Sequence, residues 1–191
     1  MAFKKFNPKH AEHLDRPDRM QNVDFDRLFS DIGVLQGQII ADIGAGTGFF
    51  SVPLARAVGS HGKVFAVDMA QEMLDRINAK VVEHGLENIV PVLSSEDRID
   101  IGDSTVDLVF TSSVFHEMRG QGTLNEIRRI LKPGGRFIVI DWKKKSKGGP
   151  PGFIKKTEGQ VIKKCGKSGL EHTGDFETGM PNKYGLIFQK P

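Results

Sequence analysis

Short apolar runs alternate with amphipathic stretches along most of this chain. Runs apolar enough for buried strands lie at 38–43, 63–68, 89–93, 106–111 and 136–141. Between them, apolar residues recur at helical spacing at 47–58, 71–84 and 123–131. Strands separated by helices form parallel sheets covered on both faces, because right-handed crossovers place the helices on the two sides. The pattern therefore predicts an α/β fold with a doubly wound sheet.

Glycine and proline mark where three of these helices begin or end. Gly85 follows the stretch at 71–84 and predicts a helix cap. Pro53 lacks an amide hydrogen and is tolerated only in a first turn, so the helix around it should start late. Pro133-Gly134-Gly135 should end the third helix and separate it from a strand that begins at Arg136.

The two ends of the chain add further elements. Residues 24–32 could form a short helix that places Leu28, Phe29 and Ile32 on one side. Beyond the Gly/Pro segment at 148–152, we expect a helix to about Lys167 and strands at 171–176 and 183–189. No helix separates these last two strands, so they should pair as an antiparallel hairpin at one edge. The expected sheet is seven-stranded and mostly parallel, with this hairpin at its C-terminal end.

Two strand ends carry the residues of a nucleoside-cofactor site. The first apolar run leads into the sequence DIGAGTG at 42–48, where alternate glycines let the backbone approach a ligand. The second run ends in Asp68, a carboxylate suited to accept hydrogen bonds from both hydroxyls of a ribose. A tight turn of purely structural purpose would also use such glycines.

The glycine spacing argues against a dinucleotide. A GxGxxG loop cradles a pyrophosphate, but here the third glycine comes one residue early, at Gly48, and Phe49 takes its expected place. Asp42 would repel a pyrophosphate, whereas it suits a ligand that carries an ammonium and a sulfonium. The sequence therefore favours a cationic cofactor.

Four segments in this order resemble the class I S-adenosylmethionine-dependent methyltransferases, in the subgroup that includes small-molecule C- and O-methylating enzymes. They are DIGAGTG at 42–48, VDM at 67–69, VDLVF at 106–110 and ILKPGGRF at 130–137. The resemblance implies a Rossmann-like methyltransferase fold with S-adenosylmethionine as cofactor. We divide the chain into a cofactor-binding methyltransferase domain at 37–191 and an N-terminal segment at 1–36, which could close over the site as a lid because the core has no inserted domain to build an acceptor pocket.

In such sheets the ligand lies over the carboxyl ends of the strands. Asp42 and the glycine loop should hold the methionine part and Asp68 the ribose. Met69 offers the adenine a soft apolar face, although it could equally belong to the core. The family places a polar residue near the adenine amino group, for which Ser95 or Glu96 would serve, unless both are exposed loop residues. The candidate cofactor-binding residues are Asp42, Gly44, Ala45, Gly46, Asp68, Met69, Ser95, Glu96, Thr111 and Ser112.

The loop at 111–117 should lie between the sulfonium and the acceptor. It lacks the Asn/Asp-Pro-Pro-aromatic motif of enzymes that methylate exocyclic amines of bases, and it holds no cysteine nucleophile. His116 is the candidate general base, because an imidazole titrates near neutrality. The alternative is a histidine packed and hydrogen-bonded at a helix start. Glu117, Asp141 and Trp142 could line the acceptor pocket, and His10 and His13 could join them if the lid forms.

Cysteine and acid content limit the chemistry further. Cys165 is the only cysteine, which excludes intrachain disulfides, cysteine-rich zinc sites and the multi-cysteine chemistry of arsenic methyltransferases. Of the clustered acids that divalent-metal O-methyltransferases need, only Asp141 sits at a matching strand end, so we expect no metal.

Composition bears on location and partners. No apolar run is long enough to span a bilayer, and residues 1–6 lack the apolar core of a secretory signal, so we expect a cytoplasmic protein without a membrane partner. Residues 1–100 hold 11 Lys and Arg against 15 Asp and Glu, whereas residues 101–191 hold 16 against 9. The dense run at 143–147 has no interleaved aromatic to stack a base, which favours a solvated loop over contact with nucleic acid or an anionic substrate.

Three function classes follow from these observations. The leading one is an S-adenosylmethionine-dependent methyltransferase that acts on a small molecule by direct displacement, with an RNA- or protein-modifying version kept as an alternative. The second is a non-catalytic S-adenosylmethionine-binding regulatory module. The third, a nicotinamide-dependent oxidoreductase, is disfavoured by Phe49 and by the lack of a convincing Tyr-x-x-x-Lys motif. The acceptor and the oligomeric state are not set by the sequence.

Overall fold

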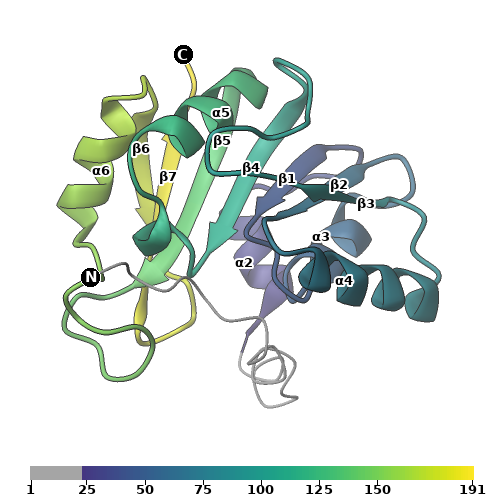
Figure 1. Ribbon diagram of the computed structural model, residues 1–191, viewed down its shortest axis with the longest axis horizontal. Helices are drawn as coiled ribbons and strands as arrows, with labels where there is room; N and C mark the ends of the chain where they lie inside the picture. The colour runs from purple at the N-terminus through teal and green to yellow at the C-terminus, as the bar shows by residue number, and fades with distance from the viewer. Residues whose placement is uncertain (1–22) are drawn as a thin grey trace.

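A seven-stranded sheet with helices on both faces forms the centre of the structure, a computed structural model that describes residues 23–191 (Figure 1). Its strands lie in the order β3-β2-β1-β4-β5-β7-β6. The strands are β1 (Ile39–Ile43), β2 (Lys63–Asp68), β3 (Ile89–Leu93), β4 (Val106–Ser112), β5 (Leu131–Trp142), β6 (Glu171–Phe176) and β7 (Lys183–Gln189). The helices are α2 (Phe25–Asp31), α3 (Ser51–Val58), α4 (Gln71–His84), η2 (Phe115–Glu117), α5 (Gly122–Ile130) and α6 (Glu158–Gly166).

The pairing of the strands confirms the expected doubly wound, mostly parallel sheet. Strands β3, β2, β1, β4 and β5 pair in parallel, and the order reverses between β1 and β4. The hairpin is antiparallel as predicted, and β7 inserts between β5 and β6. The carboxyl ends of β1 and β4 therefore meet at a switch point, where open α/β sheets bind their ligands.

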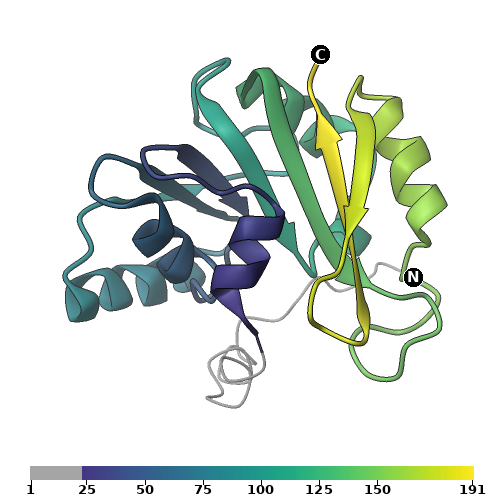
Figure 2. The same cartoon turned by 180° about the vertical axis from the view of Figure 1, so that it is seen from behind.

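Each face of the sheet has its own apolar core. Helices α2, α3 and α4 cover one face, where Leu28, Leu54 and Ile77 pack on strand residues such as Ile40 and Phe110. Helices α5 and α6 cover the other face (Figure 2). Burial on both sides explains why the central strands read as continuous apolar runs.

Local signals placed several helix ends correctly. Helix α3 starts only at Ser51, so Pro53 falls in its first turn, and Gly85 caps α4 in the left-handed conformation with φ of 60°. Helix α2 buries Leu28 and Phe29, and Ile32 just beyond its end is buried as well.

The predicted start of the fifth strand is wrong. Strand β5 begins at Leu131, directly after α5 ends at Ile130, so the Pro-Gly-Gly segment belongs to the strand. Pairing in three dimensions overrides the local turn signal, because Leu131 pairs with Val106 across a bulge. The Gly134 N–H also donates to the Lys190 carbonyl, at 2.8 Å.

Two other expectations concern the N-terminal segment and the absence of a membrane span. The proposed lid residues His10 and His13 lie outside residues 23–191, as does most of the segment 1–36. Across the described part of the chain, no helix combines the length and the apolar character that crossing a membrane requires.

Candidate functional site

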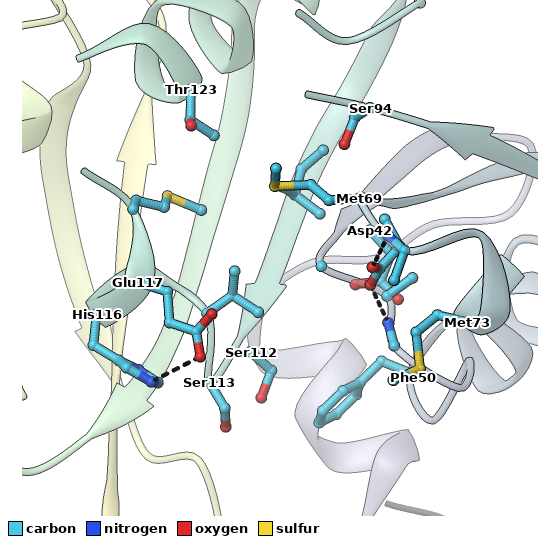
Figure 3. A pocket seen from close by; sticks show the side chains of 18 of the residues that line it. Asp42, Phe50, Met69, Met73, Ser94, Ser112, Ser113, His116, Glu117 and Thr123 are labelled. Atoms are coloured by element: carbon cyan, nitrogen blue, oxygen red, sulfur yellow. Dashed lines mark hydrogen bonds and ion pairs between the residues drawn. The ribbon is translucent and has the colours of Figure 1, made fainter. Parts of the chain in front are cut away.

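A cavity of about 1120 Å³ opens over the carboxyl ends of β1, β2 and β4 (Figure 3). Its wall comes from strand ends and the loops that follow them, together with Trp142 at the end of β5 and Gly149 and Pro150 beyond it. The predicted site residues that line it are Asp42, Gly44, Ala45, Gly46, Asp68, Met69, Ser95, Glu96, Ser112 and His116.

Thr111 is a predicted site residue that does not line this cavity. Its side chain is fully buried, and its Oγ1 donates a hydrogen bond to the Ile43 carbonyl, at 2.9 Å. Thr111 thus joins β4 to β1 inside the sheet, because the strand runs one residue further than expected and its alternation points this side chain inward. We correct its assignment from a ligand contact to a sheet contact.

The glycine loop brings bare backbone to the cavity. Gly44 and Gly46 have φ of 73° and 56°, a region that other residues rarely adopt. A Cβ on Gly44 would lie only 2.4 Å from Val114 Cγ2, so no side chain fits there. The Gly46 N–H donates to Asp68 Oδ2, at 2.8 Å, which ties the loop to the end of β2. At Gly44 and Gly46 the loop therefore lines the cavity with bare backbone, a cradle that a ligand can approach closely.

Asp42 places a buried carboxyl group on the cavity floor. Only 3% of the residue is exposed, and Ser51 Oγ donates to its Oδ2 at 2.6 Å. Burial raises the pKa of Asp42 to about 7; the Ser51 hydrogen bond opposes this rise and the charge of Asp68 adds to it. A cation in the cavity would stabilise the ionised form of this group.

The ends of β2 and β3 form the neighbouring wall. Asp68 accepts the Ala70 N–H on Oδ1, at 3.0 Å, in addition to its bond from Gly46, so both oxygens are fixed. Met69 is 47% exposed and lines the cavity, which decides against a core position. Ser95 and Glu96 both line it as well, so the geometry keeps both as candidates.

Thr47 is a lining residue that the sequence reasoning did not single out. Its buried Oγ1 has no hydrogen-bond partner among the described residues. A polar atom buried in this way costs free energy until a partner meets it. Its position inside the DIGAGTG segment was the available signal.

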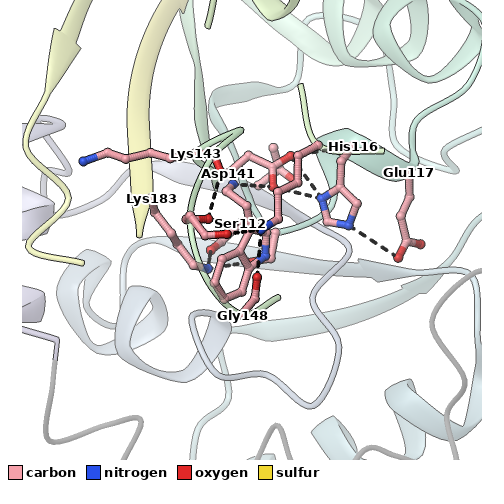
Figure 4. Close-up of polar contacts among 12 residues, drawn as sticks. Ser112, His116, Glu117, Asp141, Lys143, Gly148 and Lys183 are labelled. Carbon is pink, nitrogen blue, oxygen red and sulfur yellow. Dashed lines mark hydrogen bonds and ion pairs between the residues drawn. The ribbon is translucent and has the colours of Figure 1, made fainter. Parts of the chain in front are cut away.

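A histidine and a buried aspartate form the polar centre beyond β4 (Figure 4). His116 Nδ1 lies 2.9 Å from Asp141 Oδ1, and the His116 N–H donates to Asp141 Oδ2 at 2.8 Å. The Trp142 N–H also donates to Asp141, at 2.8 Å. Since a carboxylate can only accept, this contact places the proton on Nδ1 and leaves Nε2 on the side of Glu117, whose Oε1 is 3.8 Å away.

A nearly buried lysine lies behind the lining residues Ser113 and Trp142, a feature the sequence reasoning missed. Lys183 is 9% exposed and donates to Ser113 Oγ, and its Nζ lies 4.9 Å from the Trp142 ring centroid. Lys183 lies 41 positions after Trp142 in the sequence, so only the β5–β7 pairing brings the two together. The lysines of the run at 143–147 are exposed, as a solvated loop requires.

The remaining groups give no second centre. Cys165 is buried, and burial raises the pKa of its thiol to about 12, so it stays protonated and unreactive at neutral pH. Between residues 23 and 191, no group of three or more His, Cys, Asp or Glu side chains could hold a metal ion.

Comparison with known proteins gives consistent matches. A family model described as a methyltransferase domain matches residues 40–135. The chain is 33% identical over 114 residues to the ubiquinone/menaquinone biosynthesis C-methyltransferase UbiE of Haemophilus ducreyi. This alignment covers 59% of this chain and 44% of that protein. It is 30% identical over 106 residues to an arsenite methyltransferase of Halobacterium salinarum, covering 55% of this chain and 27% of that protein. The chain thus spans less than half the length of these curated relatives.

A solved structure matches nearly the whole chain. The crystal structure of a SAM-dependent methyltransferase from Aquifex aeolicus superposes with a TM-score of 0.92 and 32% sequence identity, covering 98% of this chain and all of that one. Together with the family match over the glycine loop and the first strands, this likeness shows that the chain belongs to the class I S-adenosylmethionine-dependent methyltransferase family.

Proposed function

We propose that this protein transfers a methyl group from S-adenosylmethionine to a small-molecule acceptor by direct displacement. One observation carries the proposal: the Gly44–Gly46 cradle, the buried Asp42 and the strand-end Asp68 all line the same cavity. This arrangement fits an aminoacyl sulfonium ligand. The backbone cradle leaves room for its approach, and its positive charges would stabilise the ionised form of Asp42. The same donor set is a poor fit for a pyrophosphate, which Asp42 would repel.

Different lining residues would bind different parts of S-adenosylmethionine. Asp42 and the glycine loop would hold the methionine part, Asp68 the ribose, and Met69 with Ser95 or Glu96 the adenine. When bound, S-adenosylmethionine would supply an electrophilic methyl group, which passes to the acceptor's lone pair as the carbon–sulfur bond breaks and its electrons stay on sulfur. The protein's own part is mainly alignment and the exclusion of water, which can lower a barrier by roughly 7–11 kcal/mol.

His116 is the proposed general base. The Asp141 carboxylate holds the imidazole by its Nδ1 and leaves Nε2 to accept a proton from an acceptor that arrives protonated. The proton then rests on His116, where the nearby carboxylates of Asp141 and Glu117 stabilise the imidazolium. In the Ser-His-Asp triads of hydrolases, which occur on other folds, an aspartate orients a histidine base through Nδ1 in the same way.

The relatives support a small-molecule acceptor. One matched relative is named for quinone biosynthesis and the other for arsenite. The single buried cysteine of this chain does not fit the multi-cysteine chemistry expected of an arsenic methyltransferase. The methyltransferase domain at 37–191 and the cytoplasmic location stay predictions of the sequence.

Calorimetric titration with S-adenosylmethionine and S-adenosylhomocysteine tests the proposal, with NADH as the negative ligand. We expect micromolar binding of both adenosyl ligands and none of NADH. Asp68→Ala should abolish this binding, whereas the matched change of an exposed acid on α4, Asp75→Ala, should leave it intact. NADH binding in place of adenosyl binding would overturn the proposal.

A screen of acceptors separates an enzyme from a binding module. Release of S-adenosylhomocysteine in the presence of a small molecule supports the proposed activity. Tight cofactor binding without turnover on any small molecule, RNA or protein acceptor would favour the non-catalytic alternative.

A further inference from the structure

The acceptor side of the cavity contains two hydroxyl groups held by a lysine. Ser112 is the last residue of β4 and Ser113 follows it, and both line the cavity (Figure 3). Lys183, the first residue of β7, donates from Nζ to Ser113 Oγ and lies 3.5 Å from Ser112 Oγ (Figure 4). An ammonium group can only donate, so the serine oxygens accept from it and their own protons are left to donate elsewhere.

Ser113 is held in an uncommon conformation to reach this position. Its φ is 63°, a left-handed conformation that is rare and strained for a residue other than glycine. The Ser113 N–H nevertheless bonds to the Ile140 carbonyl at 2.8 Å, so the neighbouring strand β5 fixes the strained turn. Strain of this kind collects where a side chain must face a ligand.

Trp142 lines the cavity beside these serines, and the ammonium groups of two lysines lie near its ring. Lys183 and Lys155 place their Nζ atoms 4.9 and 5.7 Å from its ring centroid. Lys155 is only 3% exposed and donates to the carbonyls of Ser146 and Gly148, which holds the loop against the ring. A Cβ on Gly149 would lie 2.5 Å from the Trp142 ring, so the loop can pack this closely only with glycine there.

From this arrangement we infer that the acceptor carries an anionic oxygen, such as a carboxylate, phenolate or enolate, which the Ser112 and Ser113 hydroxyls bind with Lys183 behind them. A flat apolar part of the acceptor lies against Trp142. The inference rests on the proposed function, because it names the charge of the molecule that enters the same cavity. Glu117 is the opposing group: its carboxylate lines the cavity too and would favour a cationic amine.

Intrinsic fluorescence measures directly whether the site prefers an anionic, a neutral or a cationic ligand, since Trp142 is the only tryptophan of the chain. The protein, saturated with S-adenosylhomocysteine at neutral pH, is titrated with phenylacetate, its neutral analogue phenylacetamide and the cationic phenethylamine. We expect phenylacetate to bind roughly tenfold more tightly than the amide, the gain that a charge-assisted hydrogen bond gives.

Two variants assign the preference to residues. Lys183→Met keeps the apolar stem and should remove the preference for phenylacetate. Lys143→Met, an exposed lysine that points away from the site, is the matched control and should keep it (Figure 4). Ser113→Gly accepts the left-handed backbone without strain, should weaken phenylacetate roughly threefold or more, and decides the matter if Lys183→Met does not fold.

Three results would overturn the inference: no saturable change with phenylacetate, equal binding of the acid and the amide, or a preference for phenethylamine, which would point to Glu117. A loss in Lys143→Met as large as that in Lys183→Met would overturn the assignment to Lys183. Calorimetry of S-adenosylhomocysteine runs alongside. Failure of the wild type to bind it counts against the proposed function, and the probes are then titrated into the protein alone.

Discussion

Asp42 links ligand binding to the stability of the ligand-free protein. Burial raises its pKa to about 7, far above the value of 3.8 for a free aspartate. Between these two values the native protein holds a proton that the unfolded chain has already released. The group therefore lowers stability as pH rises through this window, by up to about 1.4 kcal/mol per pH unit. The cavity keeps a destabilising carboxyl group for which a cationic ligand would compensate.

Asp42→Asn tests this linkage. The amide keeps the shape and can still accept from Ser51, so we expect the variant to be more stable than the wild type above pH 7 and similar near pH 4. Urea unfolding across this range measures the difference. Cofactor affinity should fall in the same variant, because the charge that complements the ammonium is gone. An unchanged slope of stability against pH, relative to wild type, would contradict the assignment, and Asp75→Asn provides the exposed control.

In the proposed mechanism Asp141 is a positioning residue, because it would act on the acceptor only through His116. Asp141→Asn removes the acceptor that fixes the proton on Nδ1, so we expect kcat to fall by roughly 10² or more while the affinity for S-adenosylhomocysteine stays the same. His116→Gln should cost a similar factor, and the double variant little more. A kcat profile against pH in which His116→Gln keeps the acidic limb, the rise in rate as a base loses its proton, would exclude His116 as the base.

At the scale of elements, the sequence placed most strands correctly because they are buried on both faces and read as plain apolar runs. Strand β2 and strand β3 match their predicted ranges. The sequence analysis misplaced the start of β5, because no local sequence pattern indicates the pairing of Leu131 with Val106. The same limit explains why Lys183 was missed: it reaches Trp142 through strand pairing, although 41 positions separate the two residues and no local pattern encodes this contact.

The loop after β1 allows a test at this scale. Gly44 and Gly37 both have positive φ, but a Cβ would collide with Val114 only at Gly44 and would meet nothing within 4 Å at Gly37. Gly37→Ala should therefore cost only the backbone strain, about 1–2 kcal/mol. Gly44→Ala should cost about 1–3 kcal/mol more through overpacking, and should also abolish adenosyl-ligand binding. Denaturant unfolding measures both, and equal losses in the two variants would refute the close contact at Gly44.

At the scale of the whole molecule, the cavity is made by elements from both halves of the sheet. Asp42 and Asp68 come from β1 and β2, whereas His116 comes from the segment after β4 and Trp142 from the end of β5. A ligand that fills the cavity therefore contacts parts of the chain that are separated by the switch point. Binding should stabilise both halves together, because the two cores share the same sheet.

Thermal unfolding of the full chain measures this coupling. S-adenosylhomocysteine at about 100 times its Kd should add about 2.7 kcal/mol, which for a chain of this size raises Tm by roughly 5–10 °C. We expect one cooperative transition with and without the ligand, because β1 and β4 pair directly and no separate core could unfold alone. Asp68→Ala should remove the shift and Asp75→Ala should retain it. Two transitions, only one of them raised by the ligand, would mean that the halves unfold independently and that the ligand contacts only the β1–β3 side of the cavity.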